Sequence, residues 1–253
     1  MAFIMPIANV KGGSGKSITA LALSRVLTEA DTGGGGKAMR VLMVDADPQR
    51  TVSDALDIGP SRPSLAEVIR GQVDVRDAIA TDGLFGCHII PGGLAMLKEY
   101  ACDPQAIVDA IKAVESDYDL IVIDTPGTLD NTVQGALLAA QGGNGMVLIP
   151  TALQYADVNA TDFSIQEFAK LGANDFRIVA TMIDKRSAKD NAAFREHLDN
   201  ISGGKLLKNE IQRTVVAARL GGGEDPEGPH ARNFFTTIRA LAREIMEEAT
   251  NGA

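Results

Sequence analysis

The stretch "NVKGGSGKSIT", residues 9–19, is the most informative part of this 253-residue chain. Its end, residues 15–17, matches the phosphate-binding pattern G-x-x-x-x-G-K-[ST]. The first glycine of that pattern is missing, because Val10 stands in its place, and a second lysine, Lys11, follows. An apolar run precedes the loop, so we predict a strand, a phosphate-binding turn and a helix that begins near Lys16.

Each residue type in this loop suits the binding of a phosphate chain. The glycines let successive backbone N–H groups point at an anion, and the start of the helix adds the positive end of its dipole. We expect Lys16 to contact the β- and γ-phosphates and the hydroxyl of Ser17 to bind Mg²⁺. The predicted nucleotide-binding residues are Lys11, Gly12, Gly13, Ser14, Gly15, Lys16, Ser17 and Ile18.

A second stretch, "DLIVIDTPG" at residues 119–127, supplies the carboxylate that a magnesium site needs. Asp124 follows four apolar residues, which is the position of the aspartate at the end of a Walker B strand. Gly127 has no side chain, so the backbone after this strand can approach a γ-phosphate. We therefore predict that Asp124 binds the metal.

A third stretch, "VLMVDADPQR" at residues 41–50, carries two carboxylates. Asp45 and Asp47 point to the same side if the strand is still extended there. One can hold magnesium-bound water while the other orients the attacking water. We predict Asp45 as a metal residue together with Ser17, and Asp47 as the catalytic residue that positions water. The simpler interpretation is a polar turn opened by Pro48.

Short apolar runs alternate with amphipathic segments along the chain, which indicates an α/β fold. We predict a doubly wound, mostly parallel sheet with helices on both faces, in a single domain over residues 1–253. Pro6 weakens the first strand prediction, because proline cannot donate a hydrogen bond to the ladder. The predicted strands lie in residues 3–10, 40–47, 87–92, 120–127, 146–151 and 177–184, and the predicted helices are 16–30, 94–116, 130–141, 157–171 and about 231–249.

Polar or turn residues end most of these predicted strands: Asn9, Asp45, Asp124, Pro150 and Asp184. In open parallel sheets the ligand lies beyond the carboxyl ends of the strands, so we expect the chemistry to gather there. Two Gly-rich stretches, "TGGGGK" at 32–37 and "RLGGGEDPEGPHAR" at 219–232, are predicted to be loops.

The net charge of −9 argues against a chain that is basic over its whole surface and binds nucleic acid that way. The charge is nevertheless segregated. Residues 177–219 hold nine basic and five acidic side chains, a net charge of +4, and the rest of the chain has −13. This segment is the candidate for contact with nucleic acid.

The sequence shows no secretory signal and no apolar run long enough to span a bilayer, so a cytoplasmic protein is expected. The two cysteines, Cys87 and Cys102, form neither a metal-binding spacing nor a disulfide framework. Two inert thiols in a reducing compartment are the preferred interpretation, and a cluster shared between subunits is the alternative.

Three motifs in this order, "KGGSGKS", "VDADPQ" and "IDTPG", resemble the ParA/MinD family of deviant Walker A ATPases. The chain is most similar to the small ParA type that lacks an N-terminal DNA-binding extension. The resemblance extends nearly from end to end, since "VLIPTALQYADVNATDF" and "EIQRTVVAARLGGG" also lie where that family has similar segments. It implies a weak ATPase that binds ATP and Mg²⁺ and is stimulated by a partner protein.

The resemblance also implies a role for the extra lysine. In the family this lysine reaches across a nucleotide-sandwich homodimer, so Lys11 would be a catalytic residue that touches ATP held by the partner subunit. Lys16 would touch the ATP of its own subunit. A second cation of this kind would act in trans, somewhat as an arginine finger does. Ser17 and Ile18 replace the more familiar pair of threonines, and the serine keeps the hydroxyl ligand.

The function implied by the resemblance is a cycle between an ATP-bound dimer and an ADP-bound monomer. The dimer would bind DNA without sequence preference, associate with the nucleoid and position a plasmid, a chromosome or a protein cluster. A ParB-like or adaptor protein would activate hydrolysis. The candidate DNA-binding residues are Arg186, Lys189, Lys205, Lys208 and Arg219.

Three alternatives share this kind of loop. MinD-like proteins dock on membrane through a basic amphipathic last helix, but here that helix ends in Glu244, Glu247 and Glu248, so no membrane contact is expected. Iron–sulfur reductases of the superfamily bridge a dimer through two cysteines, whereas Cys87 lies in an apolar run. A small-molecule kinase or synthetase would need a second substrate pocket.

Overall fold

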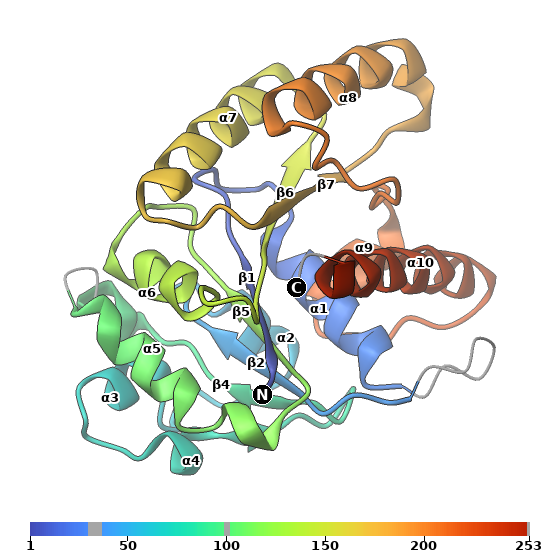
Figure 1. The fold of residues 1–253 in the computed structure, drawn as a ribbon. Coiled ribbons are helices and arrows are strands. Elements are labelled where there is room, and N and C mark those ends of the chain that lie inside the picture. Colours follow the sequence, from blue (N-terminus) through green and yellow to red (C-terminus); the bar gives the residue numbers. More distant parts are fainter. Residues whose placement is uncertain (30–36, 99–101, 252–253) are drawn as a thin grey trace.

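A seven-stranded sheet runs through the centre of the computed structural model, which describes residues 1–29, 37–98 and 102–251 (Figure 1). Its strands follow the order β3-β4-β2-β5-β1-β6-β7, and the neighbouring strands are parallel except β3 with β4. The predicted doubly wound, mostly parallel sheet is therefore confirmed. The strands are β1 (Phe3–Ile7), β2 (Val41–Asp45), β3 (Ala80–Thr81), β4 (His88–Ile90), β5 (Leu120–Asp124), β6 (Val147–Ala152) and β7 (Phe176–Thr181).

Helices cover both faces of this sheet (Figure 1). They are α1 (Lys16–Leu27), α2 (Thr51–Ala55), α3 (Leu65–Ile69), α4 (Val75–Ala78), α5 (Pro104–Lys112), α6 (Asn131–Ala139), α7 (Tyr155–Lys170), α8 (Ala188–Ser202), α9 (Val215–Gly221) and α10 (Pro229–Asn251). Short 3₁₀ helices are η1 (Leu94–Lys98), η2 (Glu115–Asp117) and η3 (Lys185–Ser187). One core lies under α1, α2, α9 and α10, and two cores on the other face lie under α3 to α8.

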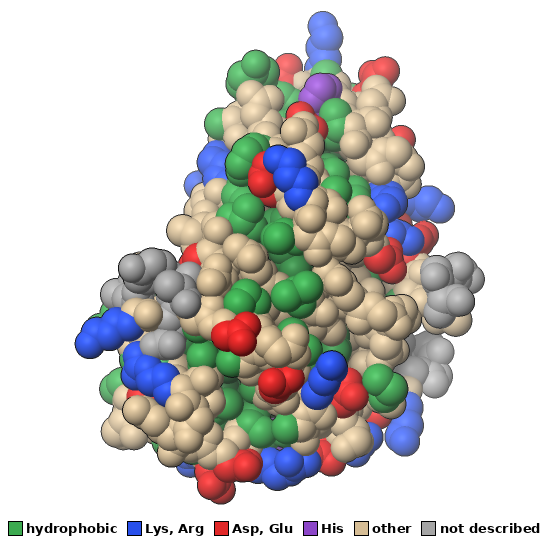
Figure 2. All heavy atoms as spheres, turned by 60° about the vertical axis from the view of Figure 1, so that its left-hand side comes forward, with side chains coloured by type: hydrophobic (Ala, Val, Ile, Leu, Met, Phe, Trp, Pro, Cys, Tyr) green, Lys and Arg blue, Asp and Glu red, His purple; other side chains and the backbone are tan. Residues whose placement is uncertain are grey.

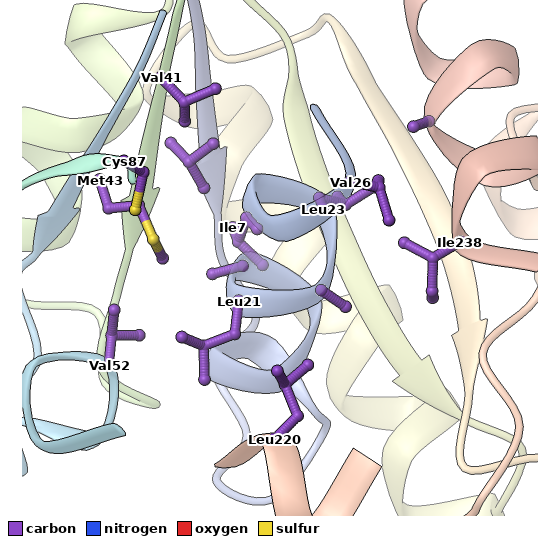
Figure 3. Packing of buried hydrophobic residues seen from close by; sticks show 14 of the residues in the cluster. Ile7, Leu21, Leu23, Val26, Val41, Met43, Val52, Cys87, Leu220 and Ile238 are labelled. Carbon is purple, nitrogen blue, oxygen red and sulfur yellow. The ribbon is translucent and has the colours of Figure 1, made fainter. Parts of the chain in front are cut away.

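Alternate residues of a strand point to opposite faces, which divides the strand side chains between these cores. In β2, Val41 and Met43 pack toward α1, and Leu42 packs on the other face. Figure 3 shows Leu21 of α1 close to these strands, and Ile238 of α10 on the far side of the same helix. Helix α1 is therefore held between the sheet and α10, and this burial fixes the helix that follows the phosphate loop.

Pro6 lies in β1, between β5 and β6, although the sequence argument weakened this strand. The backbone N–H groups of Ile4 and Ala8 donate to the segment that contains β6, and Pro6 lies between them on the same edge. One hydrogen bond of that ladder is therefore missing. The continuous pairing of β1 with β5, from Phe3 to Ile7, keeps the strand in place.

The predicted helix over residues 94–116 is wrong as a single element. It consists of η1, then α5 from Pro104, then η2, and residues 99–101 lie outside the described chain. Pro104 fits only a first helical turn, and the Asp103 side chain accepts a hydrogen bond from Gln105 N to begin that turn. The Gly-rich loop predicted at 32–37 also falls almost entirely outside the described residues, and the one at 219–232 begins inside α9 and ends inside α10.

Candidate nucleotide-binding site

The phosphate loop joins β1 to α1 as predicted. Gly13 and Gly15 have φ angles of 77° and 92°, values that glycine adopts without a steric cost. Lys16 begins α1, and its side chain curls back so that Nζ donates to the carbonyl oxygens of Lys11 at 2.8 Å and Asn9 at 3.3 Å. Burial lowers the pKa of Lys16, and the nearby Asp124 and Asp47 act in the opposite direction.

A cleft of about 810 Å³ opens above this loop, at the carboxyl edge of the sheet. Its walls come from all three sequence motifs: residues 12, 13 and 15–18, residues 47–49 and 51, and residues 126–128 and 130. The loop and the segment after β5 touch directly, since a Cβ on Gly127 would lie 2.8 Å from the backbone nitrogen of Gly12. Of the predicted nucleotide-binding residues, Lys11 and Ser14 do not line the cleft; Ser14 is buried, and its carbonyl accepts a hydrogen bond from Thr181 Oγ1.

Two buried carboxylates lie side by side at the carboxyl ends of β2 and β5, behind the residues that line the cleft. Asp45 and Asp124 are partners in the pairing of β2 with β5, and both side chains are buried. Both carboxylate oxygens of Asp124 lack a hydrogen-bond partner among the described residues. Burial raises the pKa of Asp124 well above its usual range, and the charge of Asp45 adds to this rise. The Ser17 hydroxyl is near enough to act in the opposite direction, although it does not form a hydrogen bond of normal geometry. A buried carboxylate whose oxygens lack well-formed hydrogen bonds suits a cation as its missing partner.

Asp45 is held quite differently from Asp47. Its Oδ2 accepts hydrogen bonds from Ser53 N at 2.9 Å and from Ser53 Oγ at 2.6 Å, and its Oδ1 accepts from Asp47 N at 3.1 Å. Burial raises the pKa of Asp45 to about 6, although these hydrogen bonds act to lower it. Asp47 is half-buried on the wall of the cleft. The strand ends at Asp45, so the two carboxylates do not act as an equivalent pair on one extended strand.

The residues around Asp124 fit a magnesium ion that takes its remaining ligands from water and from the nucleotide. In the described part of the chain, no group of three or more His, Cys, Asp or Glu side chains could enclose a metal. Mg²⁺ does not require such an enclosure, because it usually keeps waters and binds one or two carboxylates plus substrate phosphates. The residues that would provide the protein side of that arrangement are Asp124, Asp45 and, through its hydroxyl, Ser17.

Lys11 forms an ion pair within its own chain. Its Nζ lies 2.6 Å from Oδ2 of Asp157, the third residue of α7, whose side chain is only 5% exposed. A buried face of α7 continues this contact, because Thr161 and Ser164 bond to Asn9 and to the backbone of Val10. The arm of the phosphate loop is thus bound to α7 by a continuous series of polar contacts.

The structure spreads the five candidate DNA-binding residues over several elements. Arg186 in η3 pairs with Asp184, Lys189 lies exposed on α8, and Arg219 on α9 pairs with Glu224. Lys205 donates to the carbonyl of Asn174 at 2.8 Å and lies over the Phe176 ring, near the start of β7. Lys205 lies near the start of β7 and Arg186 follows its end, so the candidate residues do not form one compact group.

Much of the positive charge in residues 177–219 is balanced by acids from other elements. Arg177 pairs with Glu248 of α10, and Glu244 of the same helix accepts hydrogen bonds from the backbone of Lys208 and Asn209. On the face shown in Figure 2, basic and acidic side chains are interspersed, and no large patch of one sign is visible. The side chains of Lys189 and Lys208 have no ion-pair partner among the described residues.

The sequence argument missed several residues of the site. Met96 and Met182 line the cleft, and Met182 has a left-handed backbone with φ 54°. Met182 follows β7 directly, so the rule that strand ends carry the site could have indicated it. Met96 and Asp157 lie in segments with no such signal, and only the folded chain brings them to the phosphate loop.

The last helix uses its apolar face inside the protein. Phe234, Ile238 and Leu241 of α10 are buried in the core that contains α1. None of the helices in the described residues is long and apolar enough to cross a membrane. The buried Cys87 lies in the same core, where burial raises the pKa of its thiol beyond the range of a reactive cysteine.

Comparison with known proteins agrees with this geometry. The family described as AAA domain matches residues 2–174. The chromosome-partitioning ATPase Soj of Thermus thermophilus is 28% identical over 251 residues, which cover 95% of this chain and 94% of Soj.

Solved structures show the same fold. MinD from Pyrococcus horikoshii, complexed with Mg-ADP, superposes with a TM-score of 0.78 at 22% identity and covers 100% of this chain and 99% of its own. The ATP complex of a McdA protein from Cyanothece has a TM-score of 0.79 at 19% identity and covers 97% of each chain.

Proposed function

We propose that this chain, which belongs to the AAA domain family and is a ParA/MinD-type P-loop ATPase, hydrolyses Mg-ATP and dimerises when it binds ATP. The dimer would bind DNA non-specifically and in this way partition or position a cargo. The cargo would be a plasmid, a chromosome or a protein cluster on the nucleoid. A ParB-like or adaptor protein would stimulate a weak basal hydrolysis.

The observation that supports the nucleotide part is the buried Asp124, which interacts electrostatically with Lys16 on the wall of the cleft. Among the described residues, Lys16 donates hydrogen bonds to carbonyl oxygens alone, and the buried carboxylate of Asp124 accepts no hydrogen bond of normal geometry. A nucleotide phosphate with its Mg²⁺ would supply an anion to Lys16 and a cation to Asp124. The relatives crystallised with ATP or with Mg-ADP are consistent with this assignment.

Each residue of the cleft has a separate task in the proposed reaction. The loop N–H groups and Lys16 would bind and orient the phosphates. Asp124, together with Asp45, which Ser53 holds in place, would hold the cation. When bound, Mg²⁺ would neutralise charge on the β- and γ-phosphates. Asp47 on the wall of the cleft would orient the attacking water, and this positioning of the nucleophile would accelerate hydrolysis.

The proposed dimer predicts an effect of the Lys11–Asp157 ion pair on dimerisation. The Nζ of Lys11 lies 2.6 Å from Asp157 in the single chain. In the proposed dimer, Lys11 would exchange this carboxylate for a phosphate of the partner's ATP. Asp157→Asn keeps the size of the side chain and removes its charge. We expect this variant to dimerise at lower ATP concentration than wild type, whereas Lys11→Ala should bind ATP but fail to dimerise or hydrolyse.

Sedimentation velocity with and without Mg-ATP would measure both variants. Glu167→Gln, which removes the exposed Lys170–Glu167 pair on the same helix, is the matched control and should behave as wild type. A Lys11→Ala protein that dimerises and turns over normally would exclude the role in trans.

The DNA part of the proposal rests on charge segregation and on the unpaired lysines. Contacts to phosphates ignore base sequence and weaken steeply with salt. Dimerisation would double the contacts, so ATP should strengthen binding. Reversal of Lys189 and Lys208 to Glu should weaken binding to unrelated duplexes equally and leave ATP-driven dimerisation intact; Lys112→Glu on α5 is the control. A wild-type chain that binds no duplex at low salt with Mg-ATP contradicts the DNA proposal.

The alternative functions, a small-molecule kinase or synthetase and a membrane-associated ATPase, predict different assay results. A small-molecule kinase or synthetase would hydrolyse ATP only with a second substrate present, whereas the proposed ATPase turns over ATP slowly without one. A MinD-like membrane contact through α10 would need a free apolar face, but that face is buried against α1. Turnover assays without any co-substrate, with and without anionic vesicles, would separate the three.

A further inference from the structure

Arg50 has an unusual backbone for its residue type. It stands directly before α2 with φ 57° and ψ 23°, a left-handed conformation that glycine adopts freely and an arginine adopts at a cost. Its side chain is also buried, with 8% of the residue exposed. A buried arginine in a strained conformation persists only where its contacts compensate, so the contacts indicate what it does.

The guanidinium of Arg50 makes three contacts within 3.2 Å. It donates to the carbonyl oxygen of Gly92, to the carbonyl oxygen of Ile58 at 2.7 Å, and to Oδ1 of Asp54 at 3.2 Å. The planar guanidinium, with five N–H donors in a fixed geometry, can serve several acceptors at once, which an ammonium cannot do equally well. Arg50 therefore joins α2 to the segment that follows β4.

The backbone N–H of the same residue, Gly92, is held by Ser53, the residue that orients Asp45. Gly92 N donates to Ser53 Oγ at 3.0 Å, and Ser53 Oγ donates to Oδ2 of Asp45 at 2.6 Å. Gly92 also packs on Asp45 directly, because an added Cβ would lie 2.8 Å from Asp45 Cγ. Gly92, Ser53 and Asp45 thus form a ring of contacts, and Arg50 holds this ring from outside through the carbonyl oxygen of Gly92.

We propose that Arg50 is a positioning residue that sets the orientation of Asp45 toward the metal by clamping Gly92 against it. This inference rests on the proposed function, since it takes Asp45 as a metal residue. It also explains the left-handed backbone, because that conformation turns the arginine side chain inward to Gly92 at the start of α2.

The test compares metal affinity with nucleotide affinity in variants that break the ring. Electron paramagnetic resonance would measure Mn²⁺ binding in the presence of ADP, and a fluorescent ATP analogue would measure nucleotide binding without metal. Arg50→Gly removes the guanidinium and relieves the backbone. We expect a Kd for Mn²⁺ about tenfold higher, the lower end of the effect for groups that orient a metal ligand, and unchanged metal-free nucleotide binding.

Two further substitutions approach Asp45 from other directions. Gly92→Ala inserts a methyl group against Asp45 and should also raise the Kd for Mn²⁺. Because both changes act on one contact ring, the double variant should be less impaired than the sum of the two. Arg50→Lys retains the charge without the planar fork and should restore Mn²⁺ binding only in part.

Matched controls separate positioning from general damage. Asp57→Gly relieves the other left-handed residue beside α2, at φ 55°, and Asp54→Asn removes only the contact at the rim. Both should bind Mn²⁺ as wild type does. Unchanged Mn²⁺ affinity in folded Arg50→Gly overturns the inference, and if that variant does not fold, unchanged affinity in Gly92→Ala does so. A wild-type chain that binds no metal and no nucleotide overturns the proposed function and this inference with it.

Discussion

The carboxyl edge of the sheet and the basic segment 177–219 both carry concentrated charge, but the charged groups at the edge are buried, whereas many of those in the basic segment are exposed and form ion pairs. At the edge, Asp124 is buried and has no hydrogen-bond partner among the described residues, and Lys16 is buried with only carbonyl partners. In the basic segment, Arg186 and Arg219 are exposed and paired with acids of the same chain.

The two regions differ in how strongly they require a bound ligand. A buried charge without a partner raises the free energy of the folded chain, and only a ligand of the opposite sign can lower it again. Exposed ion pairs in water contribute little and can exchange partners at little cost. Substitutions at the edge should therefore change binding or stability strongly, and substitutions among the exposed pairs should change them little.

The largest effect is expected at Lys16. Lys16→Ala removes the cation that faces the phosphate chain, and we expect ATP affinity to fall at least about 100-fold, which corresponds to about 2.8 kcal/mol. Titration with a fluorescent ATP analogue in Mg²⁺ would measure it. Lys170→Ala, an exposed lysine of α7, should keep wild-type affinity. Tight binding by Lys16→Ala would show that the buried lysine is structural.

The next effect concerns the stability of the nucleotide-free chain. The folded state raises the pKa of Asp124 above the value of 3.8 for a free side chain, so ionisation costs stability as pH rises from that value and costs none below it. Asp124→Asn removes this cost, and we expect the variant to be about 2 kcal/mol more stable at pH 8. Urea unfolding without Mg²⁺ would measure the gain, which should shrink toward pH 4. A variant that is less stable at pH 8 contradicts an unsatisfied Asp124.

A smaller effect is expected at Asp47. Asp47→Ala should hydrolyse ATP at least about tenfold more slowly, because misplacing the attacking water removes the advantage of positioning. It should still bind ATP, since Asp47 is partly exposed on the wall of the cleft and is not part of the buried pair. Single-turnover hydrolysis and equilibrium binding would separate the two. Loss of ATP binding would instead transfer the hydrolytic role to Asp45.

The smallest effect should come from the exposed pair of Arg219 and Glu224. Glu224→Gln should leave the urea midpoint unchanged, because such pairs contribute little in water. It should nevertheless free one cation, so binding to duplex DNA at low salt should strengthen slightly and the salt dependence should steepen by about one unit. Competition titrations at several salt concentrations would detect this. A clear loss of stability would contradict the contrast between the two regions.

The sequence by itself determined those features that depend on neighbours along the chain. The phosphate loop needs glycines and a lysine at fixed spacing between a strand and a helix, and residues 12–17 carry them although the first glycine of the usual pattern is replaced by Val10. The strand-end positions of Asp45 and Asp124 follow from apolar runs that stop at a carboxylate. Such features are local because backbone N–H groups and strand ends are defined within a few residues.

Only the tertiary structure decided which charges meet. Asp157 lies 146 residues from Lys11, and Gly92 lies 42 residues from Arg50, yet each pair is in hydrogen-bond contact. Strand order placed β2 beside β5 and so brought Asp45 next to Asp124, and the packing of α10 brought Glu248 to Arg177. These contacts depend on the packing of elements distant in sequence, and packing is set by the summed burial of many side chains rather than by any one motif.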